Sequence, residues 1–297
     1  MKFKSKKPHY EYLRKKWIRR HRSLQEKLWE KHGQSLKHLA LGSLGGLMLL
    51  SAPPQQVLSA PTLFASRDDI LKGFDENILL AQSLSEIMPK EIRPLERDQE
   101  EKITELLSKN FGFKVLAEIE GIRLNRNYGL IGGEQHLYRY PGDNLYTHAD
   151  TTQDWAMYGS AGIAPWLGAW GYFASSKEEF TQVDKLRERY YLAVQTFLSP
   201  GFAENVEKYR VFFKFRKMLV VNPKTGQAMV AVVGDAGPAE WTGKHLGGSP
   251  EVMDALSLAG GMRKGPVVYF FIDDPEDKIP LGPIKIKREA QKYEVFL

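Results

Sequence analysis

The chain contains no cysteine among its 297 residues. This absence excludes disulfide bridges, a cysteine nucleophile and zinc sites built from thiolates. It does not decide the cellular compartment, because a chain of this length can bury a large hydrophobic core without disulfides. The hydrophobic content of 42% and the charged content of 26% are ordinary for a globular protein, and the length suits one large domain or two small ones.

An excess of positive charge is absent from the body of the chain, although the net charge is +6. Residues 1–38 contain thirteen Lys or Arg and three Glu, a net charge of +10, so residues 39–297 carry −4. The basic character therefore belongs to the N-terminal tail, and the body has no electrostatic surplus that would attract nucleic acid. We predict no nucleic-acid partner.

A long apolar run of bilayer length is also missing, but a short one follows the basic tail. Residues 39–52, "LALGSLGGLMLLSA", have no charged side chain, and a Pro/Ala/Ser-rich linker follows over 53–66. This order is typical of an export signal or signal anchor, with the basic tail left in the cytoplasm. The run reaches the roughly 20 residues of a membrane crossing only with the linker. We expect an exported body, anchored through 39–52 or released into the cell envelope; the alternative is a buried helix of a soluble protein.

The first part of the body, residues 67–112, has a helical pattern. Apolar residues recur at helical spacing over 67–88, which predicts one helix. A second helix is predicted over 95–110, with Gly112 positioned to end it. These two helices would precede the β-rich part of an α+β protein.

The remaining residues, 113–297, form the predicted β-rich domain. Alternating apolar and polar residues predict a hairpin over about 113–140, and an amphipathic pattern predicts a helix inserted over 177–198. Between them, residues 141–175 are rich in Gly, Ala and aromatic residues and have no clear period. A long segment of this kind is either functional or part of an irregular structure.

Residues 210–275 place several elements in a distinctive order. A hairpin around the turn "NPKTGQ" leads to the bend "GDAGP", then a loop, a helix beginning "SPEVMDAL", and the strand "GPVVYFFI". Ser249 is expected to cap that helix, with Pro250 in its first turn. This order resembles the second half of a double-psi β-barrel, as in rare lipoprotein A, the expansins and some membrane-bound lytic transglycosylases. The resemblance implies a six-stranded barrel-like core, and it covers under a quarter of the chain.

The resemblance also implies a groove that binds a polysaccharide, most often the glycan strands of peptidoglycan. In catalytic members an aspartate at the bend is the general acid, and Asp235 holds that place here. The apolar residues 230–233 before it would desolvate the carboxyl and raise its pKa, while Gly234 and Gly237 would let a sugar approach the backbone. The expected function is an exported, membrane-anchored cell-wall protein that binds and cleaves peptidoglycan glycan.

One carboxylate of the family pattern is missing. Many relatives carry an aspartate in a D-L-S motif before the helix, where this chain has Gly247, Gly248 and Ser249. Hydrolysis by water would need a second carboxylate, whereas a lytic reaction needs only one acid. The residues that could supply one are Glu240, Glu134, Asp150 and Asp143. The absence favours a non-catalytic expansin-like binding module. A further alternative is an interaction protein in which Asp235 is an ordinary turn residue.

The loop after Asp235 holds most of the expected sugar contacts. Trp241 is the best candidate for stacking on a sugar ring, and His245 would orient Asp235 or bind substrate. The full predicted substrate-binding set is Trp241, His245, Glu240, Gly237 and Ser249.

Only three histidines lie in the body, and two of them support a competing hypothesis. His148 and Asp150 are close in sequence and His136 precedes them by twelve residues, so the three could hold a zinc ion with an open position for water. Such a site would make the protein a zinc-dependent peptidoglycan amidase or peptidase. The spacing matches no established metal motif, so the main prediction has no metal or cofactor and counts His148 and Asp150 as catalytic partners of Asp235.

Overall fold

The computed structural model describes residues 67–287, with side chains described from residue 76. The basic tail 1–38, the predicted anchor 39–52 and the linker 53–66 lie outside the described residues, so the structure does not test them. Within the described part of the chain, no helix combines the length and the apolar character that a bilayer crossing requires.

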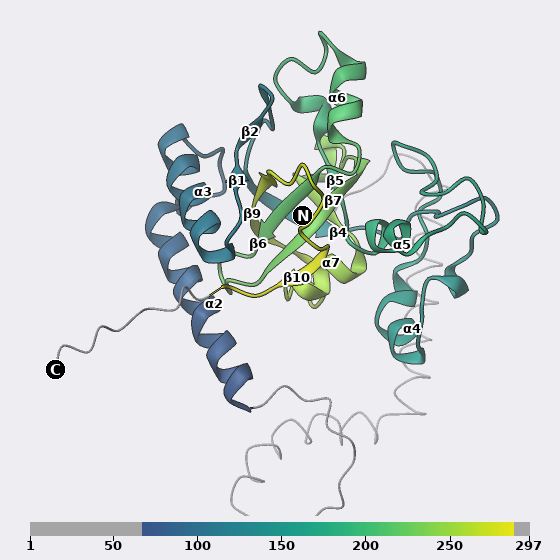
Figure 1. Ribbon diagram of the computed structural model, residues 1–297, viewed down its shortest axis with the longest axis horizontal. Helices are drawn as coiled ribbons and strands as arrows, with labels where there is room; N and C mark the ends of the chain where they lie inside the picture. Colours follow the sequence, from purple (N-terminus) through teal and green to yellow (C-terminus); the bar gives the residue numbers. More distant parts are fainter. Residues whose placement is uncertain (1–66, 288–297) are drawn as a thin grey trace, which may run out of the picture. The chain divides into compact units, whose positions relative to one another are not determined.

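Six strands close into a barrel at the centre of the described chain (Figure 1). The strands are β4 (Tyr128–Gly133), β5 (Tyr191–Val194), β6 (Lys217–Val221), β7 (Ala228–Ala236), β8 (Leu246–Gly248) and β9 (Lys264–Ile272). Hydrogen bonding runs around the ring in the order β4–β8–β5–β7–β6–β9 and returns from β9 to β4. The α+β class and the closed six-stranded barrel are therefore confirmed.

The two halves of the barrel pair in the same way. The parallel pair β4–β8 corresponds to the parallel pair β7–β5, and the antiparallel pair β4–β9 corresponds to β7–β6. The antiparallel pairs β5–β8 and β6–β9 each join two corresponding strands. The strand order thus repeats when β4, β5 and β6 are exchanged for β7, β8 and β9.

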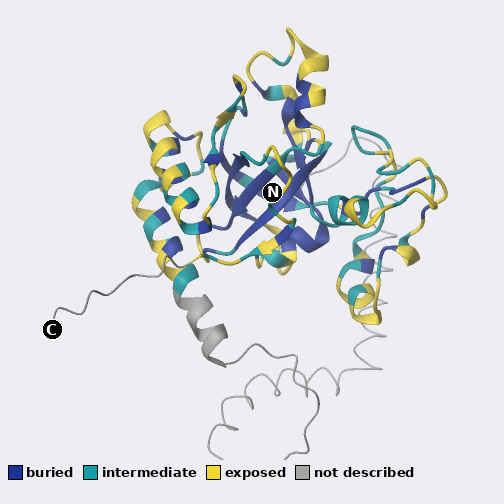
Figure 2. Ribbon diagram, viewed as in Figure 1, coloured by how far each residue is buried: buried dark blue, intermediate teal, exposed yellow. Residues whose placement is uncertain are grey.

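The central strands are apolar at nearly every position because both of their faces are covered. In β7, Met229 and Ala231 belong to the core inside the barrel, whereas Val230 between them packs in a second core. That second core includes Leu84 and Leu107 of the helices α2 (Arg67–Ile87) and α3 (Arg97–Phe111), which lie side by side against the barrel (Figures 1 and 2). The two predicted helices are confirmed, and Gly112 ends α3 with a left-handed φ of 70°.

Other local predictions are also confirmed. β6 and β7 form the predicted antiparallel hairpin around "NPKTGQ". Ser249 caps α7 (Pro250–Ala255), since its hydroxyl oxygen accepts a hydrogen bond from Val252 N at 3.2 Å. The remaining elements are β1 (Val115–Leu116), β2 (Glu118–Ile119), β3 (Ile122–Arg123), α4 (Thr152–Tyr158), α5 (Gln182–Arg189), α6 (Val206–Phe213), α7 (Pro250–Ala255) and β10 (Gly282–Ile284), with short 3₁₀ turns between them.

The predicted hairpin over 113–140 is wrong. The chain reverses at Glu120 and Gly121, whose φ angles of 54° and 75° are left-handed, and only the short strands β2 and β3 pair there. β4 pairs instead with β8 and β9 from the far end of the chain. Local alternation indicates that a strand exists but carries no information about so distant a partner.

The predicted helix over 177–198 is also wrong in extent. α5 begins after Thr181, whose hydroxyl oxygen accepts a hydrogen bond from Asp184 N, and it ends at Arg189. The chain then enters β5, whose residues are all buried between β7 and β8. Burial between two strands outweighs the helical pattern, which is a weak local preference.

A glycine in the hairpin turn fixes how α2 approaches the barrel. A Cβ atom on Gly226 would lie 1.9 Å from the carbonyl oxygen of Asn77 in α2, and the φ of Gly226 is +72°. We expect Gly226→Ala to destabilise the fold by about 2 kcal/mol or more, because a left-handed φ alone costs an alanine about 1–2 kcal/mol and the clash adds to it. The shift in the urea midpoint measures the loss.

Gly243 provides the matched control for this prediction. Its φ is +65° and no atom lies within 4 Å of the position its Cβ would take. Gly243→Ala should therefore lose only the backbone contribution. Equal losses in the two variants would show that the contact with α2 is not tight.

Candidate functional site

Asp235 lies near the end of β7, where the strand pairs with β5 across a register shift. Its Oδ1 accepts hydrogen bonds from Ala169 N at 2.7 Å and from Ala236 N at 2.8 Å. Among the described residues, none forms a hydrogen bond with Oδ2. One carboxyl oxygen is thus fixed by the backbone, and the other has no hydrogen-bond partner in the described chain.

Burial raises the pKa of Asp235 above its ordinary value, and the negative charge of Glu134 raises it further. The two backbone N–H groups stabilise the anion and oppose this shift without cancelling it. The direction agrees with the effect predicted for a carboxyl that follows an apolar strand. A raised pKa keeps a proton available for transfer.

The glycines around Asp235 have different roles. A Cβ on Gly234 would lie 2.6 Å from Cβ of Tyr191, so the close packing of these strands requires glycine there. A Cβ on Gly237 would touch only Cβ of Ala193, at 4.0 Å. There is thus room for a Cβ at Gly237, but the residue is buried, so its backbone is not open to the predicted approach of a sugar.

Glu134 lies where a side chain of residue 247 would be. It follows β4, and its N–H donates to the carbonyl of Gly248 in the parallel neighbour β8 at 2.8 Å. A Cβ on Gly247 would lie 2.4 Å from Oε1 of Glu134. Lys244 forms an ion pair with the same carboxylate. Of the four carboxylates that could replace the missing aspartate, Glu134 is thus the one that occupies its space and acts on the pKa of Asp235.

The other predicted catalytic residues have contacts of their own. Asp150 forms ion pairs with Lys185 and Arg189. His148 contacts Asp143 and Glu188. In the part of the chain that the structure describes, no hydrogen bond or ion pair joins His148 or Asp150 to Asp235.

The predicted sugar-binding residues divide into two groups. Trp241 is 89% exposed and, with the exposed Glu240, lies in a 3₁₀ turn over Glu240–Thr242. Nδ1 of His245 accepts a hydrogen bond from Leu130 N at 3.0 Å, and burial lowers the pKa of its ring, so it supports β4 as a neutral acceptor. Ser249 is buried and donates to the carbonyl of Arg189, so its hydroxyl serves the helix cap rather than a ligand.

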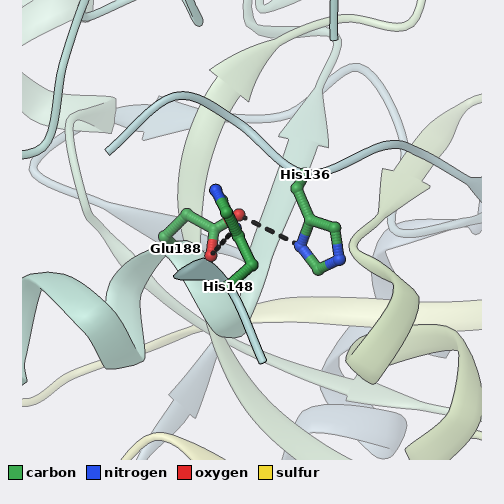
Figure 3. A group of neighbouring side chains, drawn as sticks. All are labelled: His136, His148 and Glu188. Atoms are coloured by element: carbon green, nitrogen blue, oxygen red, sulfur yellow. Dashed lines mark ion pairs between the residues drawn. The ribbon is translucent and has the colours of Figure 1, made fainter. Parts of the chain in front are cut away.

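Two of the three histidines in the body meet at a buried carboxylate. Figure 3 shows the carboxylate of Glu188 facing the rings of His136 and His148. Nδ1 of His136 lies 3.4 Å from Oε1 of Glu188, and Nδ1 of His148 lies 3.4 Å from Oε2. One ligand atom from each residue lies within 4.8 Å of the other two. The structure thus brings together the two histidines of the zinc hypothesis, but the carboxylate beside them is Glu188 and not Asp150.

A second carboxylate, that of Asp143, contacts the other ring nitrogen of His148. Nε2 of His148 lies 2.8 Å from Oδ2 of Asp143, and Arg139 donates to both oxygens of Asp143 at 3.0 and 2.8 Å. Burial opposes ionisation of Asp143, but the hydrogen bonds from His148 and Arg139 prevail and hold its pKa well below the ordinary range. The group is an ordered, charged network inside the protein.

Two buried carboxyl groups of this region have pKa values shifted in opposite directions. Burial alone would raise the pKa of Glu188, but the two adjacent imidazoles lower it to about 2. Glu251, in the first turn of α7, has a pKa of about 7, raised by its burial and by the charge of Glu188. Sequence analysis missed Glu188, because nothing in the predicted helix distinguished it from the other glutamates there.

Comparison of the chain with protein-family models, curated proteins and solved structures finds no match. Function must therefore be inferred from the geometry of the barrel and its side chains.

Proposed function

We propose that this protein is an exported double-psi barrel protein, of the type of rare lipoprotein A, the expansins and lytic transglycosylases, that binds and cleaves peptidoglycan glycan strands. The pairing pattern supports this type, because its two halves correspond strand for strand and each contributes one strand to each parallel pair. The "GDAGP" bend at the end of β7 adds the feature by which the chain resembles that group.

The observation that carries the proposal is the pair formed by Asp235 and Glu134. Asp235 has a raised pKa and one carboxyl oxygen without a hydrogen bond, and Glu134 fills the space of the side chain missing at Gly247. The two carboxylates come from corresponding strands of the barrel, since Asp235 is near the end of β7 and Glu134 follows β4. Burial and the negative charge of Glu134 both raise the pKa of Asp235, which favours the protonated form that a general acid needs.

In the proposed reaction, Oδ2 of Asp235 gives its proton to the oxygen of the glycosidic bond as that bond breaks. A hydroxyl of the same sugar then attacks the anomeric carbon and returns its proton to Asp235, so the acid is regenerated without water. The N–H groups of Ala169 and Ala236 stabilise the carboxylate that exists between the two proton transfers. Glu134 would stabilise the positive charge that develops at the anomeric carbon.

Exposed tryptophans occur on both segments beside Asp235. Trp166 is 81% exposed and lies three residues before Ala169, whose N–H binds the catalytic carboxyl. Trp241 is 89% exposed and lies in the loop that follows Asp235. Exposed indole rings are costly for a monomeric surface, and they present flat apolar faces that can stack on sugar rings.

The proposed location is the extracytoplasmic side of the membrane, with residues 39–52 as the anchor. Support comes from the composition of the N-terminal region, in which a basic tail precedes a short apolar run. Peptidoglycan would then lie within reach of the barrel.

A second candidate function is a binding module that does not cleave glycan. The hydrogen bond from Ala169 N to Asp235 favours it, because that bond ties the loop carrying Trp166 to the barrel and gives the aspartate a structural role. In this case Trp241 and Trp166 would bind sugar, and Asp235 would only position the loop.

One experiment separates these candidates. The full-length protein is incubated with insoluble peptidoglycan, and both the bound protein and the released sugar fragments are measured by mass spectrometry. Fragments with anhydro-sugar ends support the lytic reaction, and fragments with reducing ends indicate hydrolysis in which Glu134 activates water. Binding without fragments supports the module, and the absence of both would overturn the proposal.

A further inference from the structure

The strongest unexplained feature outside the Asp235 site is the state of His136. Its side chain is 2% exposed, and neither Nδ1 nor Nε2 has a hydrogen-bond partner in the described chain. Nδ1 of the buried His148 is in the same condition. Contacts of 3.4 Å with Glu188 are too long or too poorly aligned to satisfy these nitrogens. Buried polar atoms are rarely left unpaired, so these three nitrogens require an explanation.

The spacing of the imidazole nitrogens and the Glu188 carboxylate suits a metal ion; Oε1 of Glu188 also accepts a hydrogen bond from Leu137 N at 3.1 Å. A tetrahedral zinc ion with ligands about 2.0–2.1 Å away places neighbouring ligand atoms about 3.4 Å apart. Nδ1 of His136 lies 3.4 Å from Oε1 of Glu188, and Nδ1 of His148 lies 3.4 Å from Oε2, so each imidazole has this spacing to one oxygen of the carboxylate. One ligand atom from each of the three residues lies within 4.8 Å of the other two, so a bound ion would draw the two imidazoles closer together. The three ligand atoms also come from separate elements: His136 follows β4, His148 follows a 3₁₀ turn, and Glu188 lies in the last turn of α5.

The residues that contact the proposed ligands from outside the ligand set are also arranged as at a metal site. A histidine that binds a metal through one nitrogen commonly donates its other N–H to a carboxylate, which fixes the ring and its tautomer. Nε2 of His148 makes that contact with Asp143, which leaves Nδ1 directed at Glu188. Arg139 offsets the charge of Asp143, so the negative charge of Glu188 is the one that faces the two rings.

We propose that His136, His148 and Glu188 bind a divalent transition-metal ion, with zinc as the best fit to two imidazole nitrogens and one carboxylate oxygen. Three protein ligands would leave one position of a tetrahedral ion for water or another ligand. The proposal is independent of glycan cleavage, because the reaction assigned to Asp235 uses no metal.

A network without a metal is the competing explanation. A protonated His148 between Asp143 and Glu188 would be a stable ion pair, but it would leave both nitrogens of His136 unpaired. A zinc ion accounts for a nitrogen of His136, Nδ1 of His148 and the charge of Glu188 at once. The two explanations therefore differ in what happens when His136 is replaced.

Metal content after refolding tests the proposal directly. Because the ligands are buried, the full-length protein is unfolded with a chelator, refolded with Zn²⁺, freed of loose ion and analysed for bound zinc and for Tm. We expect one retained zinc per chain, a higher Tm with zinc than without it, and tetrahedral absorption bands when Co²⁺ replaces Zn²⁺. Glu188→Gln should lower zinc affinity more than about 100-fold, beyond the roughly 10–100-fold effect of an outer-shell change.

Two further variants keep the result interpretable. His136→Phe removes both nitrogens without breaking a hydrogen bond, so it should fold, retain no zinc and show no zinc-dependent rise in Tm. Asp150→Asn is the matched control, because Asp150 lies two residues from His148 but pairs with Lys185 and Arg189; it should bind zinc like the wild type. A folded wild-type protein that retains no zinc would overturn the proposal. Zinc retained equally by His136→Phe, or lost in Asp150→Asn but not in Glu188→Gln, would do the same.

Discussion

Asp235→Asn is expected to lower the rate of glycan cleavage by a factor of about 10² to 10⁴, the usual contribution of a general acid. The amide oxygen of asparagine can still accept hydrogen bonds from Ala169 N and Ala236 N. The link between the loop at Ala169 and the barrel should therefore persist, and the protein should still fold. What is lost is the proton on the second oxygen. The measurement is the initial rate of fragment release from insoluble peptidoglycan, with bound protein measured in the same samples.

Retained binding with lost cleavage would identify Asp235 as the acid. Glu105→Gln is the control, because it removes an exposed carboxylate from α3, which packs against the outside of the barrel, and should change the rate little. If Asp235→Asn cleaves at the wild-type rate, Asp235 is a structural residue and another acid must be sought.

The pH profile of cleavage gives a second check on the same residue. Asp235 must be protonated to donate, so the rate is highest below its raised pKa and falls as pH rises through that pKa. Glu134→Gln removes the neighbouring negative charge, which lowers the pKa of Asp235 and moves this fall to lower pH. A fall that stays at the same pH in Glu134→Gln would mean that the two carboxyls do not interact.

Local patterns predicted the elements that depend on neighbouring residues. The two helices before the barrel, the β6–β7 hairpin and the Ser249 cap all depend on residues that are close together in the sequence. The partners of β4 were not predictable in this way, because β8 and β9 lie more than a hundred residues further along the chain. The sequence pattern failed to predict β5 for a related reason. This segment is extended only because it is buried between two strands that are distant in the sequence.

The candidate site also combines a residue that the local sequence identifies with residues that only distant contacts place there. Asp235 could be found from a short motif, because its own bend and the apolar strand before it determine its environment. Glu134 was one of four carboxylates that the sequence could not rank, and the parallel pairing of β4 with β8 places it over Gly247. Glu188 was missed because its role depends on two histidines that the fold brings to it.

Asp143→Ala is expected to destabilise the protein by about 3–5 kcal/mol, the cost of leaving one partner of a buried ion pair without the other. The side chains of Arg139 and Asp143 are 4% and 0% exposed, and Asp143 also accepts hydrogen bonds from Asn144 N and the Thr147 hydroxyl. The unfolding free energy from urea titration measures the loss.

A double-mutant cycle separates the buried charge from the other contacts of Asp143. Arg139→Met removes the charge that Asp143→Ala would leave unpaired, so the double variant should lose less than the sum of the single losses. Asp150→Ala is the control, because its pairs with Lys185 and Arg189 are partly exposed and should be worth about 1 kcal/mol or less. Strict additivity would mean that Arg139 gains nothing from Asp143, and the segment that presents His148 would then depend on the contacts of Asp143 with Asn144, Thr147 and His148.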